Sequence, residues 1–208
     1  MEDHGNKISF KNELIRKSIH LSSSVVPLIY YFVSREFALI VLGISAFILI
    51  AIDLLRKNNE PFRHFYHRFM KPILREHEVQ YDKQVFTGGT YIVIAFFLCV
   101  LFFPKPVAIT SMFVVIFCDS SAAIIGKNWG RHFISNKTFE GSAAFFVSGV
   151  IIILLTPKVT SSVNEYYIGF AAVFLSTIFE LLPVKIDDNI STPIFFGLVY
   201  ISLMKIFL

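Results

Sequence analysis

The hydrophobic residues of this chain come in long, nearly uninterrupted blocks that short polar stretches separate. A membrane-spanning helix needs roughly 20 apolar residues, or slightly fewer when basic side chains flank it. Seven blocks have this length, at about 16–33, 37–55, 87–103, 107–125, 139–156, 165–182 and 193–208. The pattern therefore predicts an all-α, polytopic membrane helix bundle with about seven transmembrane helices.

Composition agrees with a membrane protein, since 55% of the 208 residues are hydrophobic and only 16% are charged. The first block lacks the small-residue cleavage pattern of a secretory signal, so we expect it to be retained as the first span. No internal repeat or low-complexity segment divides the chain. Residues 1–208 are therefore predicted to form one integral membrane domain.

The longest polar stretch lies at about 56–86, between the second and third blocks. Its part from 62 to 75 mixes aromatic and basic residues in the manner of a helix that lies on a membrane surface. Such a helix can gate lipid entry or anchor the protein, and we favour anchoring. The residues concerned are Phe62, Phe65, Tyr66, Phe69 and Ile73 against Arg63, Arg68, Lys71 and Arg75.

Basic residues are distributed unevenly between the two ends of the predicted spans. Fifteen of the 19 lysines and arginines fall in the N-terminal segment and in the loops at 56–86, 126–138 and 183–192. The side richer in Lys and Arg is normally cytosolic, which places the N-terminus inside. Because membrane topology accounts for these positions, the net charge of +4 is not taken to indicate nucleic acid.

Acidic residues gather at the predicted cytosolic ends of the later spans. Asp119 is the most informative, because the apolar run from Ala122 to Ile125 places it a turn or two inside the expected helix end. A carboxylate is costly there, and intramembrane charges usually mark functional sites. The other acidic members of this set are Glu140, Glu180, Asp187 and Asp188, and the polar residue Asn189 accompanies them.

Each of these features has a purely structural explanation as well. Asp119 can pair with a basic neighbour on another helix, and Lys127 and Arg131 can be ordinary cytosolic anchors. Gly126 and Gly130 can permit close helix packing or leave room for a ligand.

The helix ends also offer structural explanations. Thr138 can cap the fifth span, with Glu140 at the positive end of its dipole. The segment 187–189 can be a solvated turn, with Thr192 capping the seventh span and Pro193 in its first turn.

Taken together, these residues favour a charged ligand. Three or four carboxylates, two or three basic groups and a glycine-rich backbone on one face suit a nucleotide with magnesium. At the lipid surface, the acceptor can be a membrane-embedded alcohol whose hydroxyl reaches the headgroup region. The pattern indicates a phosphoryl or nucleotidyl transferase that acts on a lipid.

A long motif occupies the middle of the chain, Asp119-x-x-Ala122-Ala123-x-x-Gly126-x-x-x-Gly130-Arg131 followed by Ser135-x-Lys137-Thr138-x-Glu140-Gly141-Ser142. Two shorter stretches accompany it, ELIRKSIH with Glu13, Arg16, Lys17 and His20, and ELLPVKIDDNISTP with Glu180, Pro183, Asp187, Asp188, Asn189 and Pro193. Together they resemble the signature of the family of polyprenol (dolichol) kinases, phytol kinases and CTP-dependent diacylglycerol kinases. The Lys-Thr-x-Glu-Gly element is shared with the related CDP-diacylglycerol synthases.

This resemblance implies a membrane enzyme that moves the γ-phosphate of CTP to a long-chain alcohol with the help of Mg²⁺. It implies catalytic roles for Asp119, Lys137, Glu140 and Asp188, and metal binding by Asp119, Glu140, Asp187 and Asp188. It implies nucleotide contacts by Lys127, Gly130, Arg131, Lys137, Thr138 and Asn189. It also implies a supporting role in the site for Arg16, Lys17, His20 and Glu180. Which carboxylate acts as the base stays open, because that depends on its reach to the acceptor proton.

The leading hypothesis is thus a bacterial-type inner-membrane kinase whose acceptor is an isoprenoid alcohol, such as a polyprenol or phytol, or diacylglycerol. Its partners are the membrane lipid and the nucleotide, while the oligomeric state is left open. One alternative is a phosphatidate cytidylyltransferase, although the region at 185–191 reads KIDDNIS and lacks the arginine-bearing acidic signature of those enzymes. A non-enzymatic transporter or scaffold is the other alternative.

Overall fold

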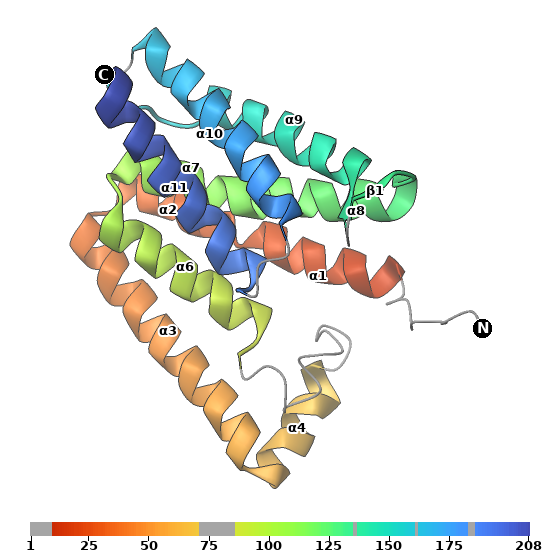
Figure 1. The fold of residues 1–208 in the computed structure, drawn as a ribbon. Helices are drawn as coiled ribbons and strands as arrows, with labels where there is room; N and C mark the ends of the chain where they lie inside the picture. Colours follow the sequence, from red (N-terminus) through yellow and green to blue (C-terminus); the bar gives the residue numbers. More distant parts are fainter. Residues whose placement is uncertain (1–9, 71–85, 135–136, 161, 183–185) are drawn as a thin grey trace.

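The computed structural model describes residues 10–70, 86–134, 137–160, 162–182 and 186–208, and in these ranges the chain is almost entirely helical (Figure 1). Its helices are α1 (Phe10–Ser22), α2 (Val25–Phe32), α3 (Arg35–Asn58), α4 (Glu60–Met70), α6 (Gly88–Phe102), α7 (Lys105–Phe113), the π-helical turn η1 (Val114–Cys118), α8 (Asp119–Trp129), α9 (Phe139–Leu155), α10 (Val163–Leu181) and α11 (Asp188–Phe207). Strands β1 (Phe133–Ile134) and β2 (Lys137–Thr138) form a short antiparallel pair. The predicted all-α class agrees with this architecture, and the hairpin is the one addition to it within the described ranges.

Three helical stretches of the described chain are long and apolar enough to cross a membrane, Arg35–Asn58, Lys105–Trp129 and Asp188–Phe207. Two further apolar helices, Gly88–Phe102 and Phe139–Leu155, are shorter. Seven crossings and a cytosolic N-terminus remain predictions.

The first predicted span is wrong as a single helix. Residues 16–33 form the end of α1 and all of α2, with a break at Ser23 and Ser24. The hydroxyl of Ser22 donates to the Ile19 carbonyl at 2.7 Å, and that of Ser23 donates to the His20 carbonyl at 2.5 Å. Serine hydroxyls compete in this way with the backbone hydrogen bonds that would continue a helix.

Two other predicted boundaries also need correction. The seventh helix begins at Asp188 rather than 193, because Asp187 is its N-cap and accepts a hydrogen bond from the Asn189 amide at 3.0 Å. Thr192 and Pro193 therefore lie within α11 rather than at its start. The fourth helix continues past 125 to Trp129, so Asp119 is about three turns from its end rather than one or two.

The core is centred on α7 and η1, whose side chains from Val107 to Met112 and from Val114 to Ile116 are almost entirely buried. Helices α2, α6, α9 and α11 all pack against this segment. Asp119 directly follows this buried segment, so the candidate carboxylate lies at its end.

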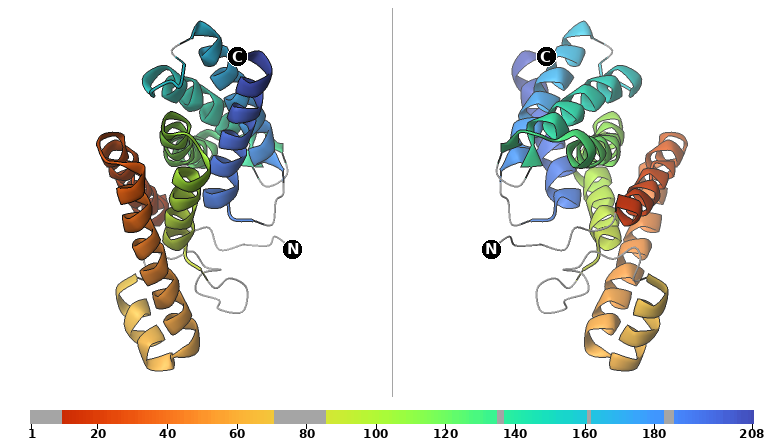
Figure 2. Two further views of the ribbon diagram at one scale, coloured as in Figure 1. Left: turned by 90° about the vertical axis from the view of Figure 1, so that its left-hand side faces the viewer. Right: turned by 90° about the vertical axis from the view of Figure 1, so that its right-hand side faces the viewer.

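Helix α4 forms at the end of α3, within the polar stretch predicted to carry a surface helix (Figure 2). The Arg56 guanidinium lies over the Tyr66 ring, 5.4 Å from its centroid, and links the two helices. The remainder of the predicted surface helix, residues 71–75, lies outside the described residues.

A buried ionic cluster that the sequence did not indicate joins α3 to α6. The Asp53 carboxylate accepts hydrogen bonds from the Thr87 amide at 2.9 Å and the Thr90 hydroxyl at 2.6 Å. The Arg56 guanidinium lies 3.3 Å from the same carboxylate. Since Asp53 and Arg56 are at most 1% exposed, this pair is inaccessible to a substrate and is assigned a structural role.

Asp53→Ala is expected to lower the free energy of unfolding by about 3–5 kcal/mol, because it leaves the Arg56 guanidinium buried without this carboxylate. Asp53→Asn keeps an acceptor oxygen for Thr87 and Thr90 and should cost less. Thermal unfolding of the two purified variants in one detergent measures the difference. An unchanged melting temperature for Asp53→Ala would show that the cluster does not stabilise the fold.

Candidate active site

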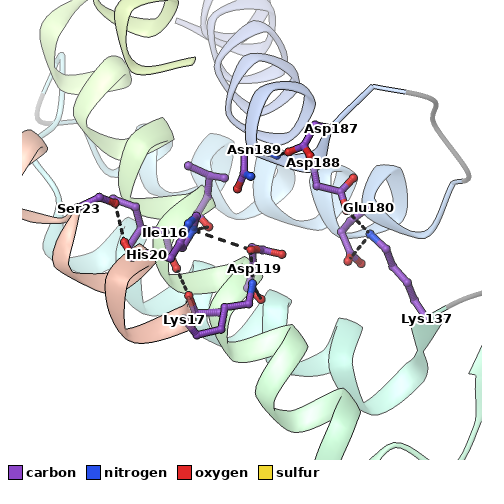
Figure 3. A network of polar contacts seen from close by, with 12 residues as sticks. Lys17, His20, Ser23, Ile116, Asp119, Lys137, Glu180, Asp187, Asp188 and Asn189 are labelled. Atoms are coloured by element: carbon purple, nitrogen blue, oxygen red, sulfur yellow. Dashed lines mark hydrogen bonds and ion pairs between the residues drawn. The ribbon is translucent and has the colours of Figure 1, made fainter. Parts of the chain in front are cut away.

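Asp119 is held by two side chains of α1, which packs against the first turn of α8 (Figure 3). The Lys17 ammonium lies 2.5 Å from Asp119 Oδ2 and 3.3 Å from the Asp119 carbonyl oxygen. His20 Nε2 lies 3.8 Å from the same carboxylate oxygen. Lys17 is 3% exposed, whereas the Asp119 side chain is 21% exposed and can be reached from one side. Lys17, His20 and Asp119 are called the Asp119 group below.

A second group of charges surrounds Lys137, which lies on β2. Its ammonium contacts Glu180 Oε1 at the end of α10, at 2.5 Å, and Asp188 Oδ2 at the start of α11, at 3.1 Å. The Glu180 side chain is 8% exposed and the Asp188 side chain 45% exposed, so the group runs from the protein interior to the surface. Lys137, Glu180 and Asp188 are called the Lys137 group.

The two groups face one another at the same end of the bundle. Figure 3 shows the Asp119 side chain between Lys17 and His20 on one side and Asn189 at the start of α11 on the other. Asp119 is near enough to Glu180 to interact with it electrostatically. Elements from opposite ends of the sequence thus place two ammonium groups and three carboxylates around one location.

The protonation state of Lys137 follows from these neighbours. Burial disfavours its charged form, but the Glu180 and Asp188 carboxylates outweigh that effect and raise the pKa of Lys137 above its usual value of 10.5. Lys137 is therefore a cation throughout the physiological pH range. An ammonium group that keeps its charge can donate charge-assisted hydrogen bonds to phosphate oxygens.

Close packing of α8 against α9 fixes the position of β2 and hence of Lys137. Thr138 caps α9 as predicted, and its hydroxyl accepts a hydrogen bond from the Gly141 amide at 3.2 Å. A Cβ atom at Gly126 would lie 2.8 Å from that hydroxyl, and one at Gly130 would lie 2.6 Å from the Thr138 methyl group. Gly126 and Gly130 thus allow α8 to pack closely against Thr138, and the space beside their backbone is filled by that residue.

The Glu140 carboxylate, another predicted metal ligand, is engaged by His132. This carboxylate pairs with His132 Nδ1 at 2.7 Å and accepts a hydrogen bond from the His132 amide at 3.3 Å. This contact closes the β1–β2 hairpin onto the start of α9. The remaining basic candidates lie nearby, with Lys127 and Arg131 exposed at and just beyond the end of α8.

Arg16, the remaining supporting residue of the prediction, lies on α1 beside Lys17 and is partly buried. Asp187 caps α11 through the Asn189 amide, so its role in the structure is that of a helix cap. The Asn189 side chain is almost fully buried.

The donor atoms of the site determine how well it suits Mg²⁺. No three His, Cys, Asp or Glu side chains among the described residues form a group that could hold a metal ion by themselves. One buried oxygen, Glu180 Oε2, nevertheless has no hydrogen-bond partner in the part of the chain that the structure describes. Mg²⁺ is usually bound by one or two carboxylates together with water and substrate phosphates. Glu180 and Asp188 fit that pattern, whereas Glu140 in its present pairing does not.

The sequence of the chain is similar to those of several known proteins. A relative from Rickettsia prowazekii (strain Madrid E), described as an uncharacterized protein, is 30% identical over 195 residues, which are 89% of this chain and 91% of the relative. CTP-dependent diacylglycerol kinase 1 of Schizosaccharomyces pombe is 30% identical over 150 residues, 68% of this chain and 66% of that kinase. The chain belongs to the family of these lipid kinases. This membership confirms the resemblance inferred from the motifs, and the same family includes dolichol kinase and the phytol kinases.

A probable phytol kinase 1, chloroplastic, from Oryza sativa subsp. japonica is 28% identical over 205 residues, 88% of this chain and 62% of the relative. The chain thus spans just under two thirds of the length of these two kinases. The names of these family members agree with the predicted enzyme class, a phosphotransferase acting on a lipid alcohol. No family model matches the chain, and no solved structure matches it.

Proposed function

We propose that this protein is a CTP-dependent kinase that phosphorylates a membrane lipid alcohol at the cytosolic face of the membrane. One observation carries the proposal beyond family membership. The Asp119 and Lys137 groups converge at one end of an apolar helix bundle, where a nucleotide from water can meet the hydroxyl of a lipid.

In this proposal Lys137 binds the transferred phosphate group and Asp119 orients the acceptor hydroxyl. Phosphoryl transfer requires alignment of acceptor and donor and neutralisation of phosphate charge, with little covalent participation by the protein. Lys137 is suited to the second task because it is charged, partly exposed and fixed by two carboxylates. Lys127 and Arg131, exposed beside the same hairpin, extend the basic surface toward the rest of the triphosphate.

A bound divalent cation would supply positive charge that neutralises the phosphate groups. Glu180 and Asp188 would hold it, since Glu180 Oε2 is buried without a partner among the described residues and Asp188 is accessible. Asp119 would lie beside this pair.

Diacylglycerol is the first acceptor to test, because the named diacylglycerol kinases match 68% of this chain. Isoprenoid alcohols come second, because the phytol kinases match at slightly lower identity. The charge distribution of the loops supports a site on the cytosolic face, and the membrane in this proposal is a bacterial-type inner membrane.

A double-label assay tests the reaction class. Purified protein in detergent is given Mg²⁺, diacylglycerol or a membrane lipid extract, and CTP that carries one label on the γ-phosphate and another on the cytosine ring. The kinase proposal requires only the γ label in the organic phase. Recovery of the cytosine label there would instead establish a cytidylyltransferase. If folded protein transfers neither label from CTP, and no γ label from ATP, the enzymatic proposal fails.

A further inference from the structure

Asp119 directly follows the π-helical turn η1, in which the helix is wider than elsewhere along α7 and α8. An α-helix advances about 100° per residue, so one extra residue in a turn rotates every following side chain by about that angle. The turn therefore helps to direct Asp119 toward Lys17 on α1 and Glu180 on α10. π-Helical turns are rare and are frequently found at functional sites.

Three backbone carbonyl groups in and after this turn receive hydrogen bonds from side chains. His20 Nε2 lies 3.2 Å from the Val115 carbonyl oxygen, and the Ser120 hydroxyl donates to the Ile116 carbonyl at 2.6 Å. Lys17 donates to the carbonyl of Asp119 itself as well as to its carboxylate. Two of the three donors come from α1, which is more than 90 residues away in the sequence.

The tautomer of His20 follows from its partner. A carbonyl oxygen can only accept a hydrogen bond, so the Nε2 atom that faces Val115 must carry the hydrogen. That nitrogen cannot take a proton from an acceptor hydroxyl while it makes this contact. His20 is thus placed to hold the backbone of the π-helical turn rather than to act as a base through Nε2.

We propose that His20 is a positioning residue for Asp119: by binding the Val115 carbonyl it fixes the π-helical turn and keeps the carboxylate directed at the reacting groups. The inference rests on the proposed function, because Asp119 must take part in transfer for its orientation to affect the rate. Lys17 contributes just after the π-helical turn, where its ammonium contacts both the carbonyl oxygen and the carboxylate of Asp119. Helix α1 is then part of the active-site framework.

Substitution of His20 tests this role. His20→Leu removes the donor to Val115 and should lower kcat by about a hundredfold, since misplacement of a catalytic group by about 1 Å can cost that much. The affinity for CTP in an equilibrium binding assay should stay within about twofold, because the Lys137 group is untouched. His20→Gln retains an N–H group at a similar position and should restore kcat to within about threefold of the wild type. His64→Leu and His64→Gln, at an exposed position on α4, provide the matched controls.

The possible results are separable. If His20→Gln is as inactive as His20→Leu while folded, the imidazole itself is required and the positioning role is overturned. Full activity of His20→Leu would also overturn it, and the proposed kinase function would stand. If His20→Leu does not fold, the activity of His20→Gln still decides the question. A wild-type protein that transfers no γ-phosphate would overturn this inference together with the proposed function.

Discussion

Replacing Asp119 with asparagine is expected to reduce γ-phosphate transfer by roughly 10²–10³-fold, the range found when one preorganised electrostatic contact to a transition state is removed. The amide has nearly the shape of the carboxylate and keeps an oxygen that can accept from Lys17. It loses the negative charge that directs the acceptor hydroxyl. The rate should therefore fall through kcat, while the binding of CTP through the Lys137 group changes little.

The γ-label assay with the preferred lipid, together with thermal unfolding of the same preparations, measures this effect. Glu36→Gln is a suitable control, because it makes the same acid-to-amide change at an exposed position in the first turn of α3. A folded Asp119→Asn protein with normal turnover would remove Asp119 from the site. A loss of activity that only matches a loss of folded protein would show that Asp119 stabilises the helix bundle instead.

The sequence predicted the helices well where hydrophobic length decided the outcome. Helices α3, α6, α9 and α10 lie within a few residues of the predicted spans, because long apolar runs have few alternatives to a helix. The errors occurred where individual side chains set the boundary. Serine hydroxyls divide the first span into α1 and α2. The Asp187 cap makes α11 begin at Asp188, five residues before the predicted start.

The candidate site could be predicted as a set of residues but not as an arrangement. Glycine spacing and charge at the helix ends indicated Asp119, Lys137 and Asp188 together. The pairing of Asp119 with Lys17, 102 residues apart, depends on how α1 packs against η1. A single sequence does not show that two residues so far apart along the chain lie close together in space. The π-helical turn was also missed, because one additional residue per turn leaves the hydrophobic pattern of a buried helix unchanged.

Glu140 illustrates the same limit at shorter range. Its place beside Lys137 and Thr138 in the motif predicted that all three would serve one nucleotide–metal site. The β1–β2 hairpin directs Lys137 toward Glu180 and Asp188, while Glu140, in the first turn of α9, pairs with His132. Sequence spacing carries no information about that pairing. The sequence predicted Glu180 only as a supporting residue, and the structure adds that its second oxygen is buried without a hydrogen-bond partner among the described residues.

Lys137→Ala is expected to produce the second large effect, a fall in kcat of about a hundredfold or more together with weaker CTP binding. The change removes the cation that the γ-phosphate requires and leaves the Glu180 and Asp188 carboxylates to repel the nucleotide. Lys137→Arg keeps the charge and should retain part of the activity, although the guanidinium is too broad to reproduce both short contacts. Lys205→Ala, at an exposed position near the end of α11, makes the same charge change away from the site and should leave the rate unaltered.

The pH dependence gives Lys137 an additional signature. Because its folded pKa is raised above 10.5, the stabilisation from its charged form is complete below that value and is lost only as the pH rises through the folded pKa. Between about pH 6 and pH 9 its charge is therefore constant, so that the ratio of wild-type to Lys137→Arg rates should be flat over this interval. Rate profiles of both proteins, measured with CTP at saturation, test this. A ratio that climbs or falls steeply within the interval would mean that Lys137 titrates there, and that the Glu180 and Asp188 carboxylates do not hold it as a permanent cation.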